Sequence, residues 1–265
     1  NNGFTVGYTN KIVECLENFS GILKEFEVDC YRCIATEACR QVINPEFFVD
    51  RVKNVSGINV EVISSYEEAK LSLNSCANYI KRMDQRGIIF DIGGGSTEIS
   101  FFNKNREIIN TSSISYGVIN LSEKKDVYGR DFVKNHLKSH FQMFRNEEFE
   151  NLKFDIKAIG SCSTVTILCA IYQNLNFFNL KKIEGFIMNT EKLSVVSNSV
   201  QKSNKENLKK ISFIGSRYEL LLNGIEILKY ILDLIPISEI IVTQRGLKEG
   251  IMQDLVSENE KNKTK

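Results

Sequence analysis

The chain has 265 residues, of which 42% are hydrophobic and 25% charged, which suits a folded protein with a sizeable core and argues against a disordered one. Its formal net charge of +1 gives no reason to expect a nucleic-acid or membrane partner, and no apolar run approaches the roughly 20 residues that span a bilayer. Seven irregularly spaced cysteines argue against a disulfide framework and favour a reducing, cytoplasmic compartment.

In the first third of the chain, helical and extended patterns alternate. Apolar residues recur at helical spacing over 10–26, after the candidate N-caps Thr9 and Asn10, and Pro45 suits the first turn of a helix that ends before Gly57. The other elements expected here are helices over 37–43 and 66–80, strands over 30–35 and 58–63, and a polar link between domains over 82–87.

After this link, a buried-type strand over 88–91 leads into three consecutive glycines. The elements expected beyond it are strands over 97–102 and 107–114 joined by a turn at 103–105, strands over 156–159 and 239–243, and helices over 164–172, 219–234 and 247–255. The last ten residues are polar, and we expect them to fray. Strands that alternate with helices predict an α/β architecture.

The segment 124–145 carries six Lys or Arg residues against Asp126 and Asp131, so it either guides a polyanion or forms a solvated basic face. His136 and His140 in this segment have the spacing of shared metal ligands. The glutamate of a zinc-protease motif is missing between them, which favours a role on the helix surface.

The most informative stretch is Asp91-Ile92-Gly93-Gly94-Gly95-Ser96-Thr97-Glu98. Its first acid ends a strand, where ligands bind in α/β folds, and the glycines let backbone N–H groups approach an anion. Ser96 and Thr97 add hydroxyl donors, and the carboxylates of Asp91 and Glu98 suit a bridging cation such as Mg²⁺. The stretch predicts a phosphate-binding loop, against the alternative of a glycine-rich hairpin with a solvated acid at each end.

Two further segments are candidates for phosphate contacts. Ile159-Gly160-Ser161-Cys162-Ser163-Thr164 lies at a strand-to-helix junction and is either a second phosphate loop at a helix N-terminus or an ordinary Ser/Thr cap. Arg40 in Ala35-Thr36-Glu37-Ala38-Cys39-Arg40 has the forked geometry that binds phosphate. Glu67-Glu68, taken alone, is a favourable charge placement in a first helical turn.

Several segments, taken in order, also carry a resemblance to a known family. They are Ala35 to Arg40 (ATxAxR in the family), Val62-Ile63-Ser64-Ser65-Tyr66-Glu67-Glu68-Ala69 (VISGxEEA), Asp91 to Glu98 (DIGGGSTE), Tyr116-Gly117-Val118 with Leu121 and Glu123, Arg217 with Glu219 and Gly224, and Gly246-Leu247-Lys248-Glu249-Gly250. Over residues 10–255 the chain thus resembles the exopolyphosphatase/guanosine pentaphosphate phosphohydrolase family of the sugar-kinase and actin superfamily.

The resemblance implies an actin-like (ribonuclease-H-like) two-domain ATPase fold with mixed sheets flanked by helices. Domain I would comprise residues 1–82, with a C-terminal helix over 246–258 returning to it, and domain II residues 83–245. The family opens with a further strand and phosphate loop, so we expect domain I to be N-terminally incomplete. The resemblance leaves a homodimer open.

The implied reaction is hydrolysis of the terminal phosphoryl group of inorganic polyphosphate or guanosine pentaphosphate. By resemblance, Glu68 is the general base, Arg40 neutralises developing charge, and Asp91 and Glu98 hold Mg²⁺. The same resemblance has phosphate cradled by the loop residues Gly93, Gly94, Gly95, Ser96, Thr97, Gly160, Ser161, Ser163 and Thr164.

The chain departs from the family pattern at Ser65 and Ser163, which stand where glycine is usual, and at Lys248, which replaces arginine. Three functions are therefore compared. The first is a Mg²⁺-dependent phosphohydrolase; the second is an impaired relative that binds nucleotide or polyphosphate without turnover; the third is a kinase or ATPase of the same fold. The Glu-Glu-Ala segment favours the first over the third.

Overall fold

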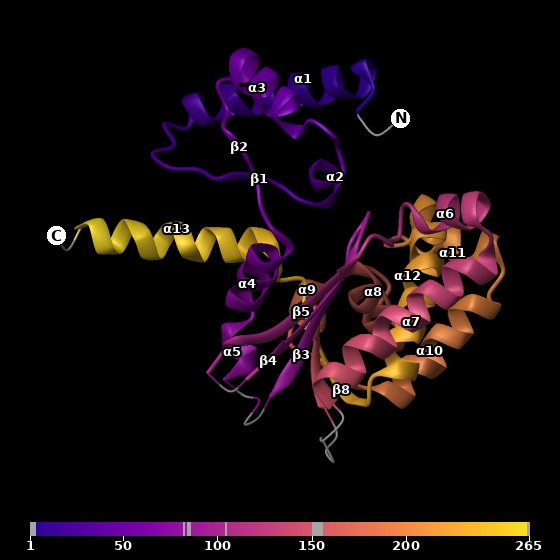
Figure 1. The fold of residues 1–265 in the computed structure, drawn as a ribbon. Helices are drawn as coiled ribbons and strands as arrows, with labels where there is room; N and C mark the ends of the chain where they lie inside the picture. Colours follow the sequence, from indigo (N-terminus) through magenta and orange to yellow (C-terminus); the bar gives the residue numbers. More distant parts are fainter. Residues whose placement is uncertain (1–3, 82, 84–85, 104, 150–155, 264–265) are drawn as a thin grey trace.

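The computed structural model describes residues 4–81, 83, 86–103, 105–149 and 156–263 (Figure 1). Its strands are β1 (Cys33–Ala35), β2 (Val60–Val62), β3 (Gly87–Ile92), β4 (Thr97–Phe102), β5 (Ile108–Ile114), β6 (Ile156–Gly160), β7 (Ile187–Asn189) and β8 (Ile237–Val242). The last six form one mixed sheet in the order β5-β4-β3-β6-β8-β7. In this sheet β6 runs parallel to β3 and β8, while β4, β5 and β7 pair antiparallel with their neighbours.

Helices flank both faces of this sheet, and the expected mixed α/β fold is confirmed. The helices are α1 (Val6–Glu25), α2 (Glu37–Arg40), α3 (Pro45–Ser56), α4 (Ser65–Ser75), α5 (Ala77–Ile80), α6 (Leu121–Tyr128), α7 (Arg130–Phe149), α8 (Ser163–Tyr172), α9 (Leu180–Ile183), α10 (Thr190–Lys202), α11 (Lys205–Lys210), the 3-10 turn η1 (Gly215–Arg217), α12 (Tyr218–Leu234) and α13 (Leu247–Lys263).

Successive side chains of β3 point to opposite faces of the sheet, into two different hydrophobic cores. Ile88 and Phe90 face the larger core, which side chains of α7, α8 and α12 complete. Ile89 faces a second core that includes Leu73 of α4 and Ile80 of α5. Since successive side chains of a strand point to opposite faces, Asp91 lies on the same face as Ile89, toward α4.

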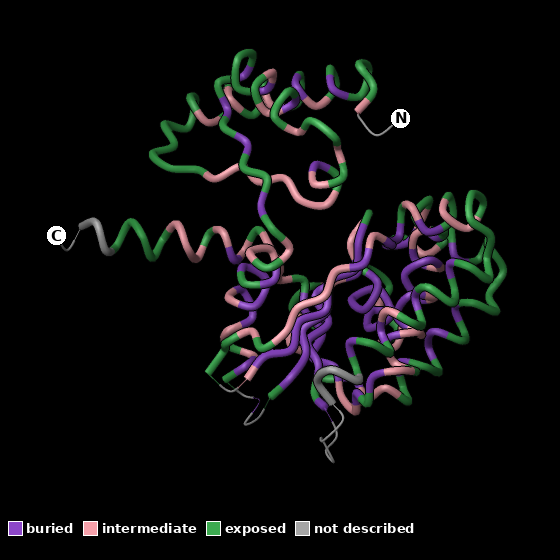
Figure 2. The backbone as a smooth tube through the Cα atoms, in the orientation of Figure 1, coloured by how far each residue is buried: buried purple, intermediate pink, exposed green. Residues whose placement is uncertain are grey.

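The N-terminal segment forms a third, smaller core. Helices α1 and α3 pack on the two parallel strands β1 and β2 through Val13, Phe48, Val52 and Val60. Figure 2 shows this region mostly exposed, whereas the strands of the six-stranded sheet are largely buried. The prediction for 45–56 is confirmed in detail, because Pro45 opens α3 and Gly57 ends it with a φ of 74°.

Several sequence-based expectations differ from the structure. The candidate N-caps Thr9 and Asn10 are wrong, because α1 begins at Val6 after Thr5, whose side chain accepts the Tyr8 N–H. The single helix predicted over 66–80 is divided at Cys76, where the backbone leaves helical geometry. We expected the last ten residues to fray, but α13 continues through most of them and ends at Lys263. Between Tyr172 and Tyr218 the structure has α9, β7, α10 and α11, which the sequence analysis did not propose.

Helix α13 packs on α4, and a Cβ at Gly250 would lie 2.1 Å from the Leu71 carbonyl oxygen. Helices α4 and α5 in turn share a core with the six-stranded sheet. The division at residues 82 and 83 stays a prediction, since Arg82, Asp84 and Gln85 of the expected link lie outside the described residues. None of the helices in the described part of the chain has the length and apolarity to cross a membrane.

Candidate active site

The sheet register brings two of the predicted site carboxylates together. Strands β3 and β4 pair antiparallel with Asp91 directly opposite Glu98, and β5 places Ser113 opposite Glu98. Directly opposed residues point to the same face of a sheet. The Ser113 hydroxyl donates to Glu98 Oε1 at 2.9 Å. An acid, an acid and a hydroxyl therefore form a row across three adjacent strands.

Glu68 faces these strand residues from helix α4, across a small pocket. Helix α4 begins after Ser64, whose hydroxyl accepts the Glu67 N–H, so Glu68 lies in the first helical turn. A small pocket is lined by Glu68, Ala69 and Ser72 of α4 and by Ile89, Asp91, Glu98 and Ser100 of the strands. The three acids proposed from the sequence as catalytic or metal-binding residues thus border one pocket.

The electrostatics of these acids are unfavourable in the absence of a cation. Burial and the charges of Glu98 and Glu68 raise the pKa of Asp91 to about 8. Burial is also the main cause that raises the pKa of Glu98 to about 7, against hydrogen bonds from Ser96 and Ser113. The pKa of Glu68 is raised as well, by burial first. A hard cation would relieve this repulsion, since it prefers carboxylate oxygens.

The site can hold such a cation only in part with its own side chains. Among the described residues, no group of three or more His, Cys, Asp or Glu side chains has the geometry of a complete metal site. Mg²⁺ usually keeps several waters and takes one or two carboxylates plus substrate phosphate oxygens. Asp91 and Glu98 match that donor set.

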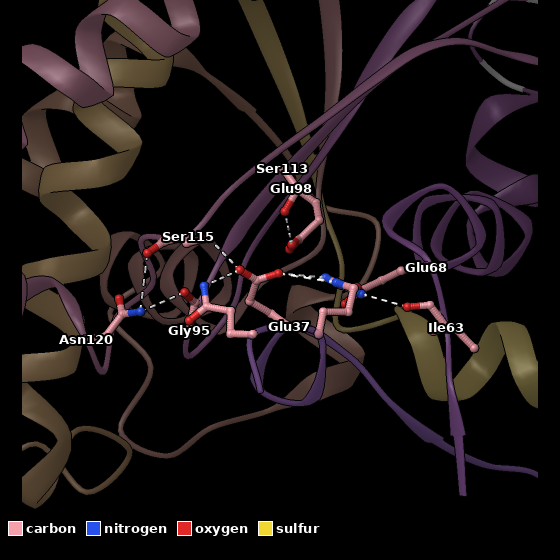
Figure 3. Close-up of polar contacts among 10 residues, drawn as sticks. Glu37, Ile63, Glu68, Gly95, Glu98, Ser113, Ser115 and Asn120 are labelled. Atoms are coloured by element: carbon pink, nitrogen blue, oxygen red, sulfur yellow. Dashed lines mark hydrogen bonds and ion pairs between the residues drawn. The ribbon is translucent and has the colours of Figure 1, made fainter. Parts of the chain in front are cut away.

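Arg40 of α2 forms ion pairs with Glu68 and with a second acid, Glu37, and Figure 3 shows these two acids near each other. Arg40 Nη1 donates to Glu68 Oε2 at 2.9 Å and to the Ile63 carbonyl oxygen at 3.0 Å. Its Nε and Nη2 both donate to Glu37 Oε2, at 3.3 and 3.1 Å. The guanidinium group is therefore engaged on both of its edges.

The first glycine-rich loop connects β3 to β4 and is held by the segment after β5. The Gly93 N–H donates to the Ser96 carbonyl at 2.9 Å, and the Gly93 carbonyl accepts the Val118 N–H at the same distance. A Cβ at Gly117 would lie 2.4 Å from the Gly94 carbonyl carbon and oxygen. Only glycine fits this approach, which explains the Tyr116-Gly117-Val118 segment.

The second loop follows β6 and faces the first one. The Ser161 N–H donates to the Phe90 carbonyl at 3.0 Å, and its hydroxyl donates to the Arg245 carbonyl. A pocket of about 390 Å³ lies between the two loops, and its lining residues are Asp91, Ile92, Gly93, Gly94, Val118, Ser161, Cys162, Ser163, Gln244 and Lys248. Asp91 borders both this pocket and the smaller acidic one.

The predicted phosphate-binding residues thus separate into two groups. Gly93, Gly94, Ser161 and Ser163 line the pocket between the loops. The other five have contacts within the protein. The Gly95 carbonyl accepts a hydrogen bond from the Asn120 side chain, Ser96 forms a hydrogen bond with Glu98, and the Thr97 hydroxyl donates to the Tyr116 carbonyl. Gly160 packs within β6, and Thr164 packs against Gly224. Phosphate contacts stay a prediction for both groups.

Sequence reasoning missed several residues of this site. Glu37 was quoted only within the Arg40 segment, although its spacing of three from Arg40 on a helix favours an ion pair. Asn120 was passed over, yet it donates to the Gly95 carbonyl and accepts the Gly117 N–H, both at 2.8 Å. His136 and His140, which the sequence singled out, lie on α7 and form hydrogen bonds with the hydroxyl groups of Tyr116 and Ser112, each at 2.9 Å.

The fold and the site together define a chain with a mixed α/β fold and an acidic pocket beside two facing glycine-containing loops. The model of the Ppx/GppA phosphatase family matches residues 1–259, and the chain belongs to this family.

Curated relatives are distant and longer. The chain is 25% identical over 250 residues to a bifunctional 3-dehydroquinate synthase/phosphatase of Fusobacterium nucleatum, covering 88% of this chain and 36% of the relative. It is 24% identical over 254 residues to a guanosine-5'-triphosphate,3'-diphosphate pyrophosphatase of Photobacterium profundum, covering 92% and 48%. The chain therefore spans at most about half of these relatives.

Solved structures confirm the fold. An exopolyphosphatase from Cytophaga hutchinsonii matches with a TM-score of 0.80 and 23% identity, covering 97% of this chain and 84% of the other. The Ppx/GppA family member of Aquifex aeolicus matches with a TM-score of 0.77 and 23% identity, covering 98% and 85%.

Proposed function

We propose that the chain is a Mg²⁺-dependent phosphohydrolase that releases the terminal phosphate of inorganic polyphosphate or guanosine pentaphosphate. The observation that carries the proposal is the position of Asp91, which borders both the acidic pocket with Glu68 and the pocket between the two glycine-containing loops. A phosphate bound between the loops would meet the acids at this point. The names of the relatives, an exopolyphosphatase and a pyrophosphatase, support a phosphoanhydride substrate.

In this proposal the strand carboxylates of Asp91 and Glu98 hold the cation. Three features fit that role: the two carboxylates share a face of the sheet, they repel each other, and Glu98 accepts hydrogen bonds from Ser113 and Ser96. When bound, Mg²⁺ would neutralise charge on the phosphoryl oxygens and help orient water. Gly93 and Gly94 line the pocket that receives the phosphate in this proposal, and Lys248 in the same lining adds a positive charge.

Glu68 accepts the proton of the attacking water. Its raised carboxyl pKa, caused mainly by burial, makes it a stronger base than an exposed glutamate. In this proposal Arg40, which is hydrogen-bonded to Glu68, neutralises the charge that develops on the phosphoryl group. These roles need positioning and charge rather than covalent chemistry, as phosphoryl transfer generally does.

The test is phosphate release by the purified chain from long-chain polyphosphate and, separately, from guanosine pentaphosphate, each with Mg²⁺ and with EDTA. We expect Mg²⁺-dependent release from at least one substrate, and stepwise shortening if polyphosphate is cleaved from its end. Absence of release from both substrates, with Mg²⁺ present, would contradict the proposal.

One observation favours the second candidate, a relative that binds polyphosphate or nucleotide without turnover. In this structure Arg40 already donates to two carboxylates, those of Glu68 and Glu37, and must leave one of them to meet a phosphate. If the chain binds polyphosphate in a filter or calorimetric assay but releases no phosphate, this candidate replaces the enzyme.

A further inference from the structure

Glu37 and Arg40 form an ion pair that is largely shielded from solvent. Their side chains are 15% and 19% exposed, and Glu68, the other partner of Arg40, is 14% exposed. An exposed ion pair contributes little, but a largely shielded one is screened less by water and salt. The pairing of Arg40 is thus a defined state of the site.

The edge of the guanidinium group that faces Glu37 is the one suited to phosphate. Nε and Nη2 lie side by side and donate to the same Glu37 oxygen. Arginine binds phosphate through such parallel N–H groups. The other end of the group, Nη1, is occupied by Glu68 and the Ile63 carbonyl. A phosphate that uses the fork must displace the Glu37 carboxylate.

Glu37 is also held from the opposite side. Its Oε1 accepts the Ser115 hydroxyl and, at 2.6 Å, Gln41 Nε2. Burial works against its ionisation, but these bonds and that of Arg40 lower the pKa of its carboxyl group. Ser115 follows β5, and its carbonyl accepts Asn120, which also donates to the Gly95 carbonyl. Glu37 therefore lies between Arg40 and the support of the first loop, as Figure 3 shows.

We propose that Glu37 is a resident competitor of substrate phosphate for Arg40. With no phosphate bound, its carboxylate occupies the Nε–Nη2 edge of Arg40. When a phosphoryl group enters, that edge turns from Glu37 to the phosphate oxygens. The Ser115 hydroxyl, which holds the Glu37 carboxylate beside Arg40, favours the unliganded pairing. Glu37 is thus a positioning residue that acts through Arg40. The inference rests on the proposed function to the extent that Arg40 contacts a phosphoryl group.

The test compares the affinity of the full chain for imidodiphosphate, a diphosphate that resists hydrolysis, by calorimetry with Mg²⁺ present. Glu37→Gln keeps the side-chain shape but removes the competing charge, and we expect binding about tenfold tighter, which corresponds to about 1.4 kcal/mol. Glu61→Gln is the matched control, because Glu61 also pairs with an arginine, Arg32, at 2.7 Å. We expect that variant to bind as the parent does.

A double-mutant cycle shows whether Glu37 acts through Arg40. In an Arg40→Ala background, Glu37→Gln should change affinity by less than about twofold, because no shared partner remains. Ser115→Ala, which leaves every charge in place, should tighten binding by about two- to threefold in the parent, as expected for one hydrogen bond that holds Glu37. This variant gives a second measurement should Arg40→Ala fail to fold.

Unchanged or weaker binding by Glu37→Gln would overturn the inference, as would a tightening that persists in the Arg40→Ala background. The absence of imidodiphosphate binding in both the parent and Glu37→Gln would overturn it too. Failure of the proposed function alone has a different signature: the parent binds imidodiphosphate and Glu37→Gln tightens it, but neither protein releases phosphate from polyphosphate or guanosine pentaphosphate.

Discussion

The two sides of the acidic pocket are built in different ways. On the strand side, the register of β3 and β4 fixes Asp91 and Glu98, and backbone hydrogen bonds fix the loop between them. On the helix side, Arg40 ends a helix of four residues and Glu68 lies in a first helical turn. These two side chains are held mainly by ion pairs.

This difference matches what each side has to do in the proposed reaction. A cation and a bound phosphate need the same ligand geometry in every turnover, which a sheet register supplies. A base and a charge-neutralising arginine must change partners during turnover, which ion pairs between long side chains allow. The strand side should therefore govern binding of the cation, and Glu68 on the helix side the chemical step.

The largest effect is expected at Glu68. Glu68→Gln removes the base, and kcat should fall by about 10³-fold, within the usual range for general base catalysis. Because a carboxylate repels a polyanion, polyphosphate affinity should stay equal or increase, which marks an interaction used in the transition state. Steady-state kinetics with a direct binding assay measure both quantities.

Glu67→Gln is the matched control, since Glu67 lies in the same helical turn but pairs with Arg32 outside the pocket. It should keep parental kcat and affinity. If Glu68→Gln hydrolyses as fast as the parent, Glu68 is not the base and the helix side does not govern chemistry.

Asp91 should give the next largest effect, on metal dependence. Asp91→Asn replaces a hard anionic ligand with a neutral amide. The Mg²⁺ concentration for half-maximal activity should therefore rise by about 100-fold or more, because even residues that only support metal ligands contribute up to about 100-fold in metal affinity. Asp131→Asn, an exposed acid on α7, is the charge-matched control. A Mg²⁺ titration that is unchanged in Asp91→Asn would remove the metal assignment.

The comparison also shows where sequence reasoning succeeded. The strand side is encoded locally: the run from Asp91 to Glu98 contains both acids and the turn that brings them into register. A short antiparallel connection fixes pairing almost by itself. The fold class could be predicted for the same reason, because β3, β4, β6 and β8 are apolar runs next to recognisable turns or helices.

The helix side could not be predicted in this way. Glu68 was singled out only through the family resemblance, because its partner Arg40 lies 28 positions away. Glu37 meets Ser115 across 78 positions, and no pattern in one sequence connects two residues at that distance. Long-range ion pairs depend on how packed elements meet, which local periodicity does not report.

A third prediction tests the rigidity of the strand side. Gly117→Ala would place a methyl group 2.4 Å from the Gly94 carbonyl, where backbone cannot yield easily. Such overpacking should lower the free energy of unfolding by about 2–3 kcal/mol and weaken phosphate binding by moving the loop. Denaturant unfolding and phosphate titration measure the two effects.

The control for Gly117 is Gly21→Ala in α1, where no atom lies within 4 Å of the added methyl group. An alanine in a helix interior should stabilise by about 0.5–1 kcal/mol. Should Gly117→Ala prove as stable as the parent and bind phosphate equally well, the segment after β5 does not hold the loop.

The smallest effect is the pH dependence of stability that the strand acids impose. Folded Asp91 keeps its proton up to a pKa of about 8, while the unfolded chain loses it near 3.8. Between these values the folded state binds more protons, so stability falls as pH rises. Without Mg²⁺, the melting temperature of the parent should fall from pH 5.5 to pH 8, and Asp91→Asn should reduce that fall by several degrees. Glu98 adds a change of the same sign, completed near pH 7.

His140, whose pKa is lowered by burial, changes stability in the opposite direction, but it is present in both proteins and cancels in the difference between them. Parallel melting curves for parent and variant across this range would show that Asp91 is already ionised without a cation, and the strand side would then need no metal to be stable.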